Sequence, residues 1–341
     1  KIIIDSNGLN YQGDPDTFIV EYDTDGETLN IVYVDATKGW IPLNDDDVTD
    51  APTVLPTQKA IFGYGNASPV TAITNLVNSS GVIATDTTGV GTAREKPAAA
   101  GYGTDKGIFA YGHDGSNVNM SNLVTNAGVV GTDVTGVGTA RNMPGAAGYG
   151  LDKAIFAYGD AGGVVSMSNL VTNVGVVGTD VGGVGSARYS PGATEYGSTG
   201  QAIFAYGSTG SEVSMSNLVT NVGVVGTDVS GVGTVRRGSA AAGYGTDTAI
   251  FAYGYSGSAY LAVSNLVTNV GVIGSDVGAV GTIRQALAAA RYGGDKAVFA
   301  YGSPRTSLKN LVNSSGVVAA DVTGVGTARE NLAAAGYSSS A

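Results

Sequence analysis

The sequence has no cysteine, a single histidine and a single tryptophan among its 341 residues. The lack of cysteine excludes disulfide bonds and thiolate metal sites, and it leaves the redox compartment open. Charged residues make up only 13%, and acidic residues outnumber basic ones by 28 to 17, for a formal net charge of −11. Because no basic stripe could follow a phosphate backbone, we expect no nucleic-acid partner.

Long apolar runs are missing as well. None approaches the roughly 18 residues that a membrane-spanning helix requires, so we expect no membrane insertion. No long amphipathic stretch with capping residues predicts a helix either. The sequence begins at Lys1, without a Met or a signal-peptide hydrophobic stretch, which indicates a fragment or a processed product.

A repeat of about 47 residues dominates the chain from residue 57 onward. Copies of the segment KAIFGYG begin at Lys59, Lys106, Lys153, Gln201, Thr248 and Lys296. Three further segments recur six times with it, and they are close to SNLV, VGVVGTDV and AAAGYG. Each is short, apolar or β-branched, and bounded by glycine, which is typical of a strand. Four strands in a repeat of this length favour one blade of a β-propeller, so we predict an all-β, six-bladed propeller with four-stranded blades over residues 57–341.

The first and last copies are out of phase. The repeat starts on KAIFGYG and ends on AAAGYS, so residues 59–65 and 333–338 each lack a neighbour along the chain. Pairing them would complete a blade, remove two exposed strand edges and close the ring through the C-terminal strand. The small side chains of AAAGYG favour the innermost position, where blades converge, and VGVVGTDV is then the outer strand.

The order of these segments resembles a Kelch repeat, with KAIFAYG in the place of that family's glycine-ended strand. In this chain the glycine doublet is Tyr-Gly, and the later tryptophan is missing from all six copies. The resemblance implies a propeller and carries no expectation about a ligand.

The first 50 residues differ from the repeats. The stretches KIIID, TFIVEYD and TLNIVYVDATKGWIPL predict three or four strands in a small β-rich module, and residues 51–56 are expected to be a linker. The string IVYVDATKGWIPL, from Ile31 to Leu43, resembles a short module of bacteriophage tail fibres and other virion fibre proteins. That resemblance implies a trimeric β-stalk, and hence a homotrimer that also contacts other virion proteins.

Every repeat carries an aspartate followed at constant spacing by an arginine. The pairs are Asp86 and Arg94, Asp133 and Arg141, Asp180 and Arg188, Asp228 and Arg236, Asp276 and Arg284, and Asp321 and Arg329. They are either a ring of functional charges or structural groups, as charge pairs or as an Asp turn with an Arg that ties blade to blade. Six equal copies favour the structural interpretation, because catalysis needs one asymmetric site. We therefore predict no catalytic residue and no enzymatic activity.

No metal or cofactor site is predicted. The acidic stretch Asp23–Glu27 lacks the full calcium-loop pattern and is interpreted as a turn, and the run Asp45–Asp47 as solvated linker. His113 has no nucleophile or metal cluster to act with, so a loop-surface role is favoured.

The copies differ mainly in the loop after KAIFAYG and in the loop after the repeated arginine. The polar and aromatic residues that these loops offer to a ligand are His113, Asp114, Tyr189, Tyr255, Tyr260 and Arg305. Sugars stack on tyrosines and hydrogen-bond to Asp and Arg, so glycan binding is one interpretation. Neutral drift is the favoured one from the sequence alone, because loops tolerate change without any function.

The leading functional hypothesis is a structural and adhesive virion appendage, a tail or head fibre whose propeller loops recognise a host-surface glycan or receptor. The alternative is a carbohydrate- or protein-binding propeller of a cell-surface or secreted protein. A glycan-processing enzyme is disfavoured, because such enzymes need a unique pair of acidic residues and this chain shows repeated ones.

Overall fold

The computed structural model describes residues 2–13, 20–22, 29–43, 58–278 and 281–338. The chain divides into two compact units, Lys1–Leu55 and Pro56–Ala341. The predicted linker at 51–56, the turn at Asp23–Glu27 and the acidic run Asp45–Asp47 lie outside the described residues.

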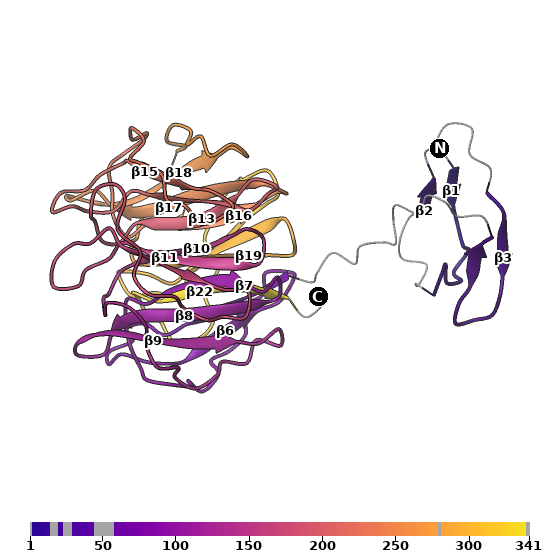
Figure 1. The fold of residues 1–341 in the computed structure, drawn as a ribbon, viewed down its shortest axis with the longest axis horizontal. Helices are drawn as coiled ribbons and strands as arrows, with labels where there is room; N and C mark the ends of the chain where they lie inside the picture. The colour runs from indigo at the N-terminus through magenta and orange to yellow at the C-terminus, as the bar shows by residue number, and fades with distance from the viewer. Residues whose placement is uncertain (1, 14–19, 23–28, 44–57, 279–280, 339–341) are drawn as a thin grey trace. The chain divides into compact units, whose positions relative to one another are not determined.

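The structure is all-β, as the sequence predicts (Figure 1). Its described part contains only strands and the turns that join them. It therefore includes no helix long and apolar enough to cross a membrane.

The first unit contains two short antiparallel strand pairs in its described residues. Strand β1 (Ile2–Ile4) pairs with β2 (Val20–Tyr22), and β3 (Ile31–Tyr33) pairs with β4 (Trp40–Pro42). The ring of Tyr33 contacts the ring of Trp40 across the second pair, with centroids 5.5 Å apart. The fibre-like string thus folds as a β-hairpin.

The turn of this hairpin is built by Asp35 and Gly39. A carboxylate oxygen of Asp35 accepts hydrogen bonds from the backbone N–H groups of Lys38 and Thr37, at 2.7 and 2.8 Å. These bonds hold the pKa of Asp35 below its usual value. Gly39 has φ +67°, and a Cβ there would lie 1.6 Å from the carbonyl oxygen of Asn10. Only glycine fits this position.

The second unit repeats one arrangement of three antiparallel strands, an AAAGY strand, a KAIFA strand and an NLV strand. Its strands are β5 (Gln58–Gly63), β6 (Thr74–Val77), β7 (Ala98–Tyr102), β8 (Lys106–His113), β9 (Asn117–Val124), β10 (Gly145–Tyr149), β11 (Lys153–Ala157), β12 (Ser168–Val171), β13 (Gly192–Tyr196), β14 (Gln201–Ala205), β15 (Ser216–Val219), β16 (Ala240–Tyr244), β17 (Thr248–Tyr255), β18 (Tyr260–Val267), β19 (Ala288–Tyr292), β20 (Lys296–Ala300), β21 (Lys309–Val312) and β22 (Ala333–Ser338). Among the described residues they form six three-stranded sheets.

The fourth predicted strand, VGVVGTDV, is not a continuous strand. In the first repeat it joins β6 only through isolated bridges, Val77 to Ile83 and Thr74 to Thr87. Between these bridges the buried side chain of Asn75 donates hydrogen bonds to the carbonyl oxygen of Ala84 and to Asp86, at 3.0 and 2.9 Å. Backbone hydrogen bonds remain at the bridges and from the N–H of Ala84 to the carbonyl oxygen of Leu76, so the expected four-stranded blade is a three-stranded sheet with a bridged outer segment.

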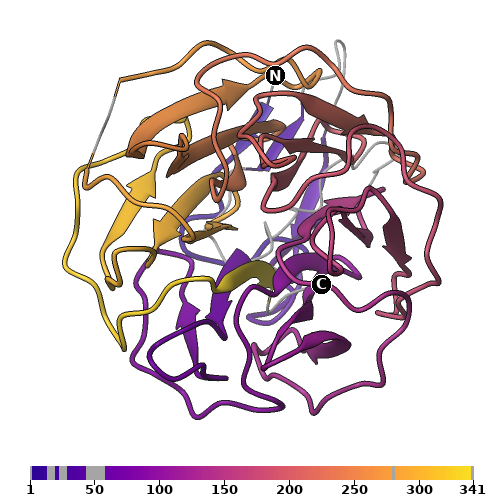
Figure 2. The same cartoon turned by 90° about the vertical axis from the view of Figure 1, so that its left-hand side faces the viewer.

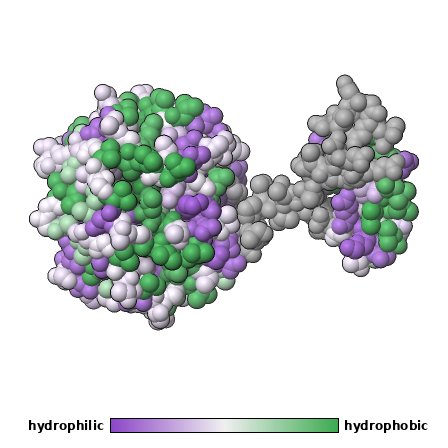
Figure 3. All heavy atoms as spheres, in the orientation of Figure 1, coloured by the Kyte–Doolittle hydropathy of each residue, from purple (hydrophilic) through white to green (hydrophobic). Residues whose placement is uncertain are grey.

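The outer segments also leave apolar side chains in contact with solvent. Valines such as Val174, Val222 and Val270 are 67–70% exposed. Figure 3 shows hydrophobic residues spread over the visible face of the repeat unit.

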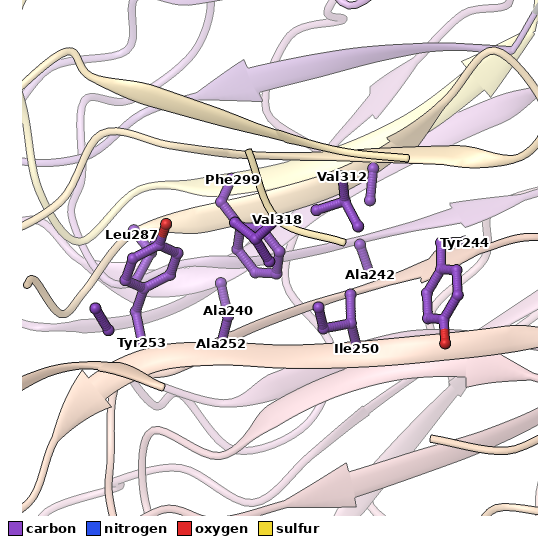
Figure 4. Close-up of a cluster of buried hydrophobic side chains, with 12 residues drawn as sticks. Ala240, Ala242, Tyr244, Ile250, Ala252, Tyr253, Leu287, Phe299, Val312 and Val318 are labelled. Carbon is purple, nitrogen blue, oxygen red and sulfur yellow. The ribbon is translucent and has the colours of Figure 1, made fainter. Parts of the chain in front are cut away.

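The apolar core lies between neighbouring sheets. Figure 4 shows one such cluster, in which Tyr253 of β17 and Phe299 of β20 belong to adjacent sheets. Their rings meet edge to face with centroids 5.6 Å apart. The same contact joins Tyr64 to Phe109, Tyr111 to Phe156, Tyr158 to Phe204, Tyr206 to Phe251 and Tyr301 to Phe62. Each pair adds about 0.5–1.5 kcal/mol beyond the area it buries.

The AAAGY strands occupy the centre of a propeller-like arrangement (Figure 2). They contact one another in the order β7–β10–β13–β16–β19–β22, and β22 contacts β7. The pairing expected between the two ends of the repeat is present, because β22 runs antiparallel to β5 with Ala335 opposite Ile61.

Candidate functional site

The six repeated arginines are fully buried between adjacent sheets. The guanidinium carbon of Arg94 lies 4.1 Å from the ring centroid of Tyr64 in one sheet. From this position Nη2 donates to Oδ1 of Asn122 in the next sheet at 2.8 Å, and Nε donates to the carbonyl oxygen of Tyr111. We call the boundary between two adjacent sheets a seam. A cation that stacks on a ring of one sheet and hydrogen-bonds to the next sheet stabilises the seam.

The stacking recurs in all six copies, with distances of 3.7–4.2 Å. The arginine-to-asparagine hydrogen bond recurs in five of them. At the remaining seam Arg329 donates to the carbonyl oxygens of Tyr64 and Thr327. Its Nη2 and Oδ1 of Asn75 have no hydrogen-bond partner there.

Each repeated aspartate forms hydrogen bonds at the seam with the preceding repeat. Asp133 accepts hydrogen bonds from the N–H and hydroxyl of Thr92 at 3.0 and 2.7 Å, and from the amide of Asn122 at 2.9 Å. The same contacts join Thr139 to Asp180, Ser186 to Asp228, Thr234 to Asp276, Thr282 to Asp321 and Thr327 to Asp86. The aspartate near an arginine thus comes from the following repeat, and Asp86 serves the seam of Arg329 rather than that of Arg94.

The charge states of these groups suit a structural role. Partial burial alone would raise the pKa of Asp133, but the hydrogen bonds from Thr92 and Asn122 outweigh it and lower the pKa. Burial lowers the pKa of Arg94, and burial raises the pKa of Tyr64 to about 12. Near neutral pH the aspartate and arginine are therefore charged and the tyrosine is neutral.

The loops that follow the arginines meet at one end of the inner strands. Six residues there have φ between 51° and 61°, and each donates its N–H to the carbonyl of a neighbouring copy at 2.7–3.2 Å. They are Lys96, Met143, Ser190, Gly238, Ala286 and Asn331. These loops border a pocket of about 350 Å³, which also includes Tyr189 and Arg237. We call this region the loop end.

The three tyrosines predicted from the loops come together at the loop end. Tyr255 and Tyr260 face each other across the β17–β18 hairpin, with ring centroids 5.7 Å apart. The guanidinium carbon of Arg237 lies 5.0 Å from the ring centroid of Tyr255 and 5.8 Å from that of Tyr189. Arg237 also forms an ion pair with Glu212. We call these five residues the tyrosine cluster.

The predicted site residues His113, Asp114 and Arg305 make their polar contacts in other repeats and are not part of the tyrosine cluster. His113 pairs through its backbone with Glu95, and Asp114 accepts a hydrogen bond from the N–H of Ser116. Arg305 forms an ion pair with Glu330 at 3.2 Å.

Arg237 and Glu212 were not among the residues predicted from the sequence. Arg237 had a detectable signal, because it directly follows the repeated Arg236 and makes a doublet that the other five copies lack. Glu212 lies in a variable loop, and its role depends on a contact with Arg237, 25 residues later in the same repeat.

A second cavity, of about 170 Å³, is lined by the inner strands. Its walls are mainly alanine and glycine, and Glu195 and Arg291 are among the charged exceptions. Sequence reasoning missed these two because it searched the loops for variation and treated the strands as uniform.

A scan against protein-family models and a search of curated proteins found no match for this chain. The candidate site is therefore defined by its own side chains. Within the described residues, no group of three or more His, Asp and Glu side chains could hold a metal ion.

Proposed function

We propose that residues 57–341 form a closed, six-bladed, Kelch-like β-propeller that displays a glycan-binding surface at its loop end. Four sets of contacts that each return to their starting repeat support closure. They are the inner-strand contacts, the Phe–Tyr contacts, the Asp–Thr or Asp–Ser hydrogen bonds and the backbone ring at the loop end.

The tyrosine cluster carries the binding proposal. It occurs once, whereas the arginine–tyrosine stacking, the edge-to-face ring contacts and the aspartate hydrogen bonds between sheets occur in all six copies, so symmetry of the scaffold does not explain it. Tyr189, Tyr255 and Tyr260 are each partly exposed, and Tyr189 also lines the pocket. Exposed tyrosine rings can stack on the apolar face of a sugar, while Arg237 offers hydrogen-bond donors beside them.

The charges of the cluster favour a neutral sugar and a binding role. Glu212 already neutralises Arg237, so the surface has little net charge to attract an acidic residue. Glycoside hydrolysis needs two carboxyl groups that flank the bond to be cut. Glu212 is the single carboxylate of the tyrosine cluster, and it is already engaged in an ion pair with Arg237.

We further propose that the protein is a virion appendage, a tail or head fibre, with residues 1–50 as a trimerising stalk module that contacts other virion proteins. The hairpin Ile31–Pro42, which carries the fibre-like string, is the observation that motivates this assignment. Light scattering tests it. A trimeric mass is expected for the full chain, and a strictly monomeric mass would contradict the trimer.

A glycan array probed with the full chain tests the loop end. We expect binding to neutral glycans that is lost in Tyr255→Ala/Tyr260→Ala and weakened in Arg237→Ala. The matched control is Lys296→Gln, which removes one ion-paired cation that follows the opposite end of an inner strand. The proposal is wrong if the wild-type chain binds no glycan, or if the tyrosine variant binds as well as the wild type.

A further inference from the structure

The channel between the inner strands contains two charged residues at positions where four of the six repeats have glycine. The fourth residue of the AAAGY strand faces the channel and is Gly101, Gly148, Glu195, Gly243, Arg291 or Gly336. Uniform glycine would suffice for close approach of the strands. Two departures of opposite sign in one cavity therefore point to a use of the channel that the scaffold does not require.

Glu195 extends from β13 over the neighbouring strand β10. A Cβ built on Gly148 would lie 2.7 Å from Oε2 of Glu195, so glycine at 148 makes room for the carboxylate. Glu195 is half-buried, and its carboxylate makes no hydrogen bond or ion pair with the described residues. It is an uncompensated negative charge within the channel.

Arg291 extends from β19 over the neighbouring strand β16. Its Nε donates to the carbonyl oxygen of Gly294 at 2.7 Å, and its Nη2 donates to that of Gly245. A Cβ built on Gly243 would lie 3.7 Å from Nη1. Two carbonyls thus fix the guanidinium, while its charge has no carboxylate partner among the described residues and Nη1 keeps its donors free.

The other charged residues of the channel cannot neutralise this pair. Lys106 and Lys153 also line the cavity, but they form ion pairs with Asp105 and Asp152. No ion pair joins Glu195 to Arg291 in the described structure, so the two charges stand apart in a cavity lined mainly by small apolar residues. Partly buried charges without partners cost free energy, and a ligand that pairs with both would recover it.

We propose that the channel binds a small zwitterion, with its ammonium group toward Glu195 and its carboxylate toward Nη1 of Arg291. The cavity of about 170 Å³ suits a molecule the size of an amino acid. A divalent metal fits less well, because Glu195 is the one carboxylate of the cavity lining and such ions require several oxygen ligands. This site shares no lining residue with the pocket at the loop end, so it is independent of glycan binding.

Isothermal titration calorimetry and ligand-observed NMR on the full chain test the proposal. The probes are L-alanine, γ-aminobutyrate and glycine betaine, with acetate and ethylammonium as singly charged comparisons. At least one zwitterion is expected to bind at millimolar concentration or below and to bind more tightly than either comparison. The variants Glu195→Gly and Arg291→Gly restore the residue of the other four repeats, so both are compatible with the fold. Each is expected to weaken binding about tenfold, the effect of losing one charged hydrogen bond.

Gly148→Ala tests the position of the Glu195 carboxylate while leaving its charge in place. Its added methyl would displace the Glu195 carboxylate, whereas a Cβ at Gly101 meets its nearest atom at an ordinary 3.5 Å. Gly148→Ala is therefore expected to weaken binding more than Gly101→Ala does. The proposal is overturned if no zwitterion binds the wild-type chain, or if the two reversions to glycine leave binding unchanged.

Discussion

Arg236 and Arg237 are neighbours in the sequence and belong to two different regions of the molecule. Arg236 lies in a seam between sheets, is fully buried and stacks 3.7 Å from the ring centroid of Tyr206. Arg237 lies at the loop end, where its side chain is 32% exposed. The first has a counterpart in all six repeats, and the second has none.

This difference separates scaffold from candidate function. A contact present at every seam is explained by the need to join one sheet to the next. A contact present once, between side chains from different repeats, has no such explanation. The tyrosine cluster belongs to the second kind, and Glu195 and Arg291 are side chains that the scaffold likewise does not repeat. These are the places where ligand chemistry is expected.

The largest predicted effect tests the seam directly. Arg236→Met removes the partner of Asn265 and leaves its buried amide oxygen unsatisfied. We expect the free energy of unfolding to fall by about 3 kcal/mol or more, since breaking a buried charged contact leaves polar groups without partners. Arg237→Met should lower it by less, because the ion pair of Arg237 with Glu212 is partly open to water, which screens its charges. Urea denaturation measures both, and equal losses would show that the two regions do not differ as proposed.

The next effect concerns the seam aspartates and pH. Partial burial opposes ionisation of Asp276, but the hydrogen bonds from Thr234 and Asn265 prevail, so its folded pKa is lowered. The lowered pKa stabilises the fold above the unfolded value of about 3.9, and this stabilisation is lost as pH falls through the folded pKa. The other five seam aspartates shift in the same direction. We expect Tm to be level near neutral pH and to fall below about pH 4.

Asp276→Ala checks that assignment. It should lower stability at neutral pH by about 1–3 kcal/mol, because Asp276 accepts hydrogen bonds from the N–H and hydroxyl of Thr234 and from the amide of Asn265. It should also flatten the acid dependence, because one of the six titrating groups is gone. A variant whose Tm falls with acid as steeply as that of the wild type would argue against the seam aspartates as its cause.

A smaller effect on stability is expected at the loop end. Tyr260→Ala removes one ring of the edge-to-face pair with Tyr255 and should cost about 0.5–1.5 kcal/mol. Glycan binding should fall far more than stability does. Thermal denaturation alongside the array separates the two, and a loss of binding that only follows unfolding would remove the tyrosine cluster as a site.

The smallest effect is predicted for the channel. Glu195→Gly removes a side chain without hydrogen-bond partners, so the loss should stay within the roughly 1 kcal/mol that glycine costs in a strand. Chemical denaturation checks this value. A large loss would mean that Glu195 supports the fold, and the channel would then resemble a seam.

Much of the fold was predictable because its signals are local. The alternation of KAIFAYG, the small residues of AAAGYG and the glycine-bounded turns each indicate a strand from residues that lie close together in the sequence. The phase of the first and last copies likewise predicts the pairing of β22 with β5. The predicted fourth strand is only bridged to its neighbour, where the carbonyl oxygen of Ala84 accepts a hydrogen bond from the side chain of Asn75, a contact that no local pattern predicts.

The sequence by itself determined the all-β class, the six repeats and the residues that every repeat shares. Only the tertiary structure decided which repeat each side chain contacts. Asp133 bonds to Thr92, 41 residues away, and Arg237 meets Tyr189 from 48 residues away. Such contacts depend on how one sheet docks against the next, and no local pattern encodes that geometry. For the same reason, Glu195 and Arg291 were inconspicuous in the sequence until the inner strands enclosed them in one channel.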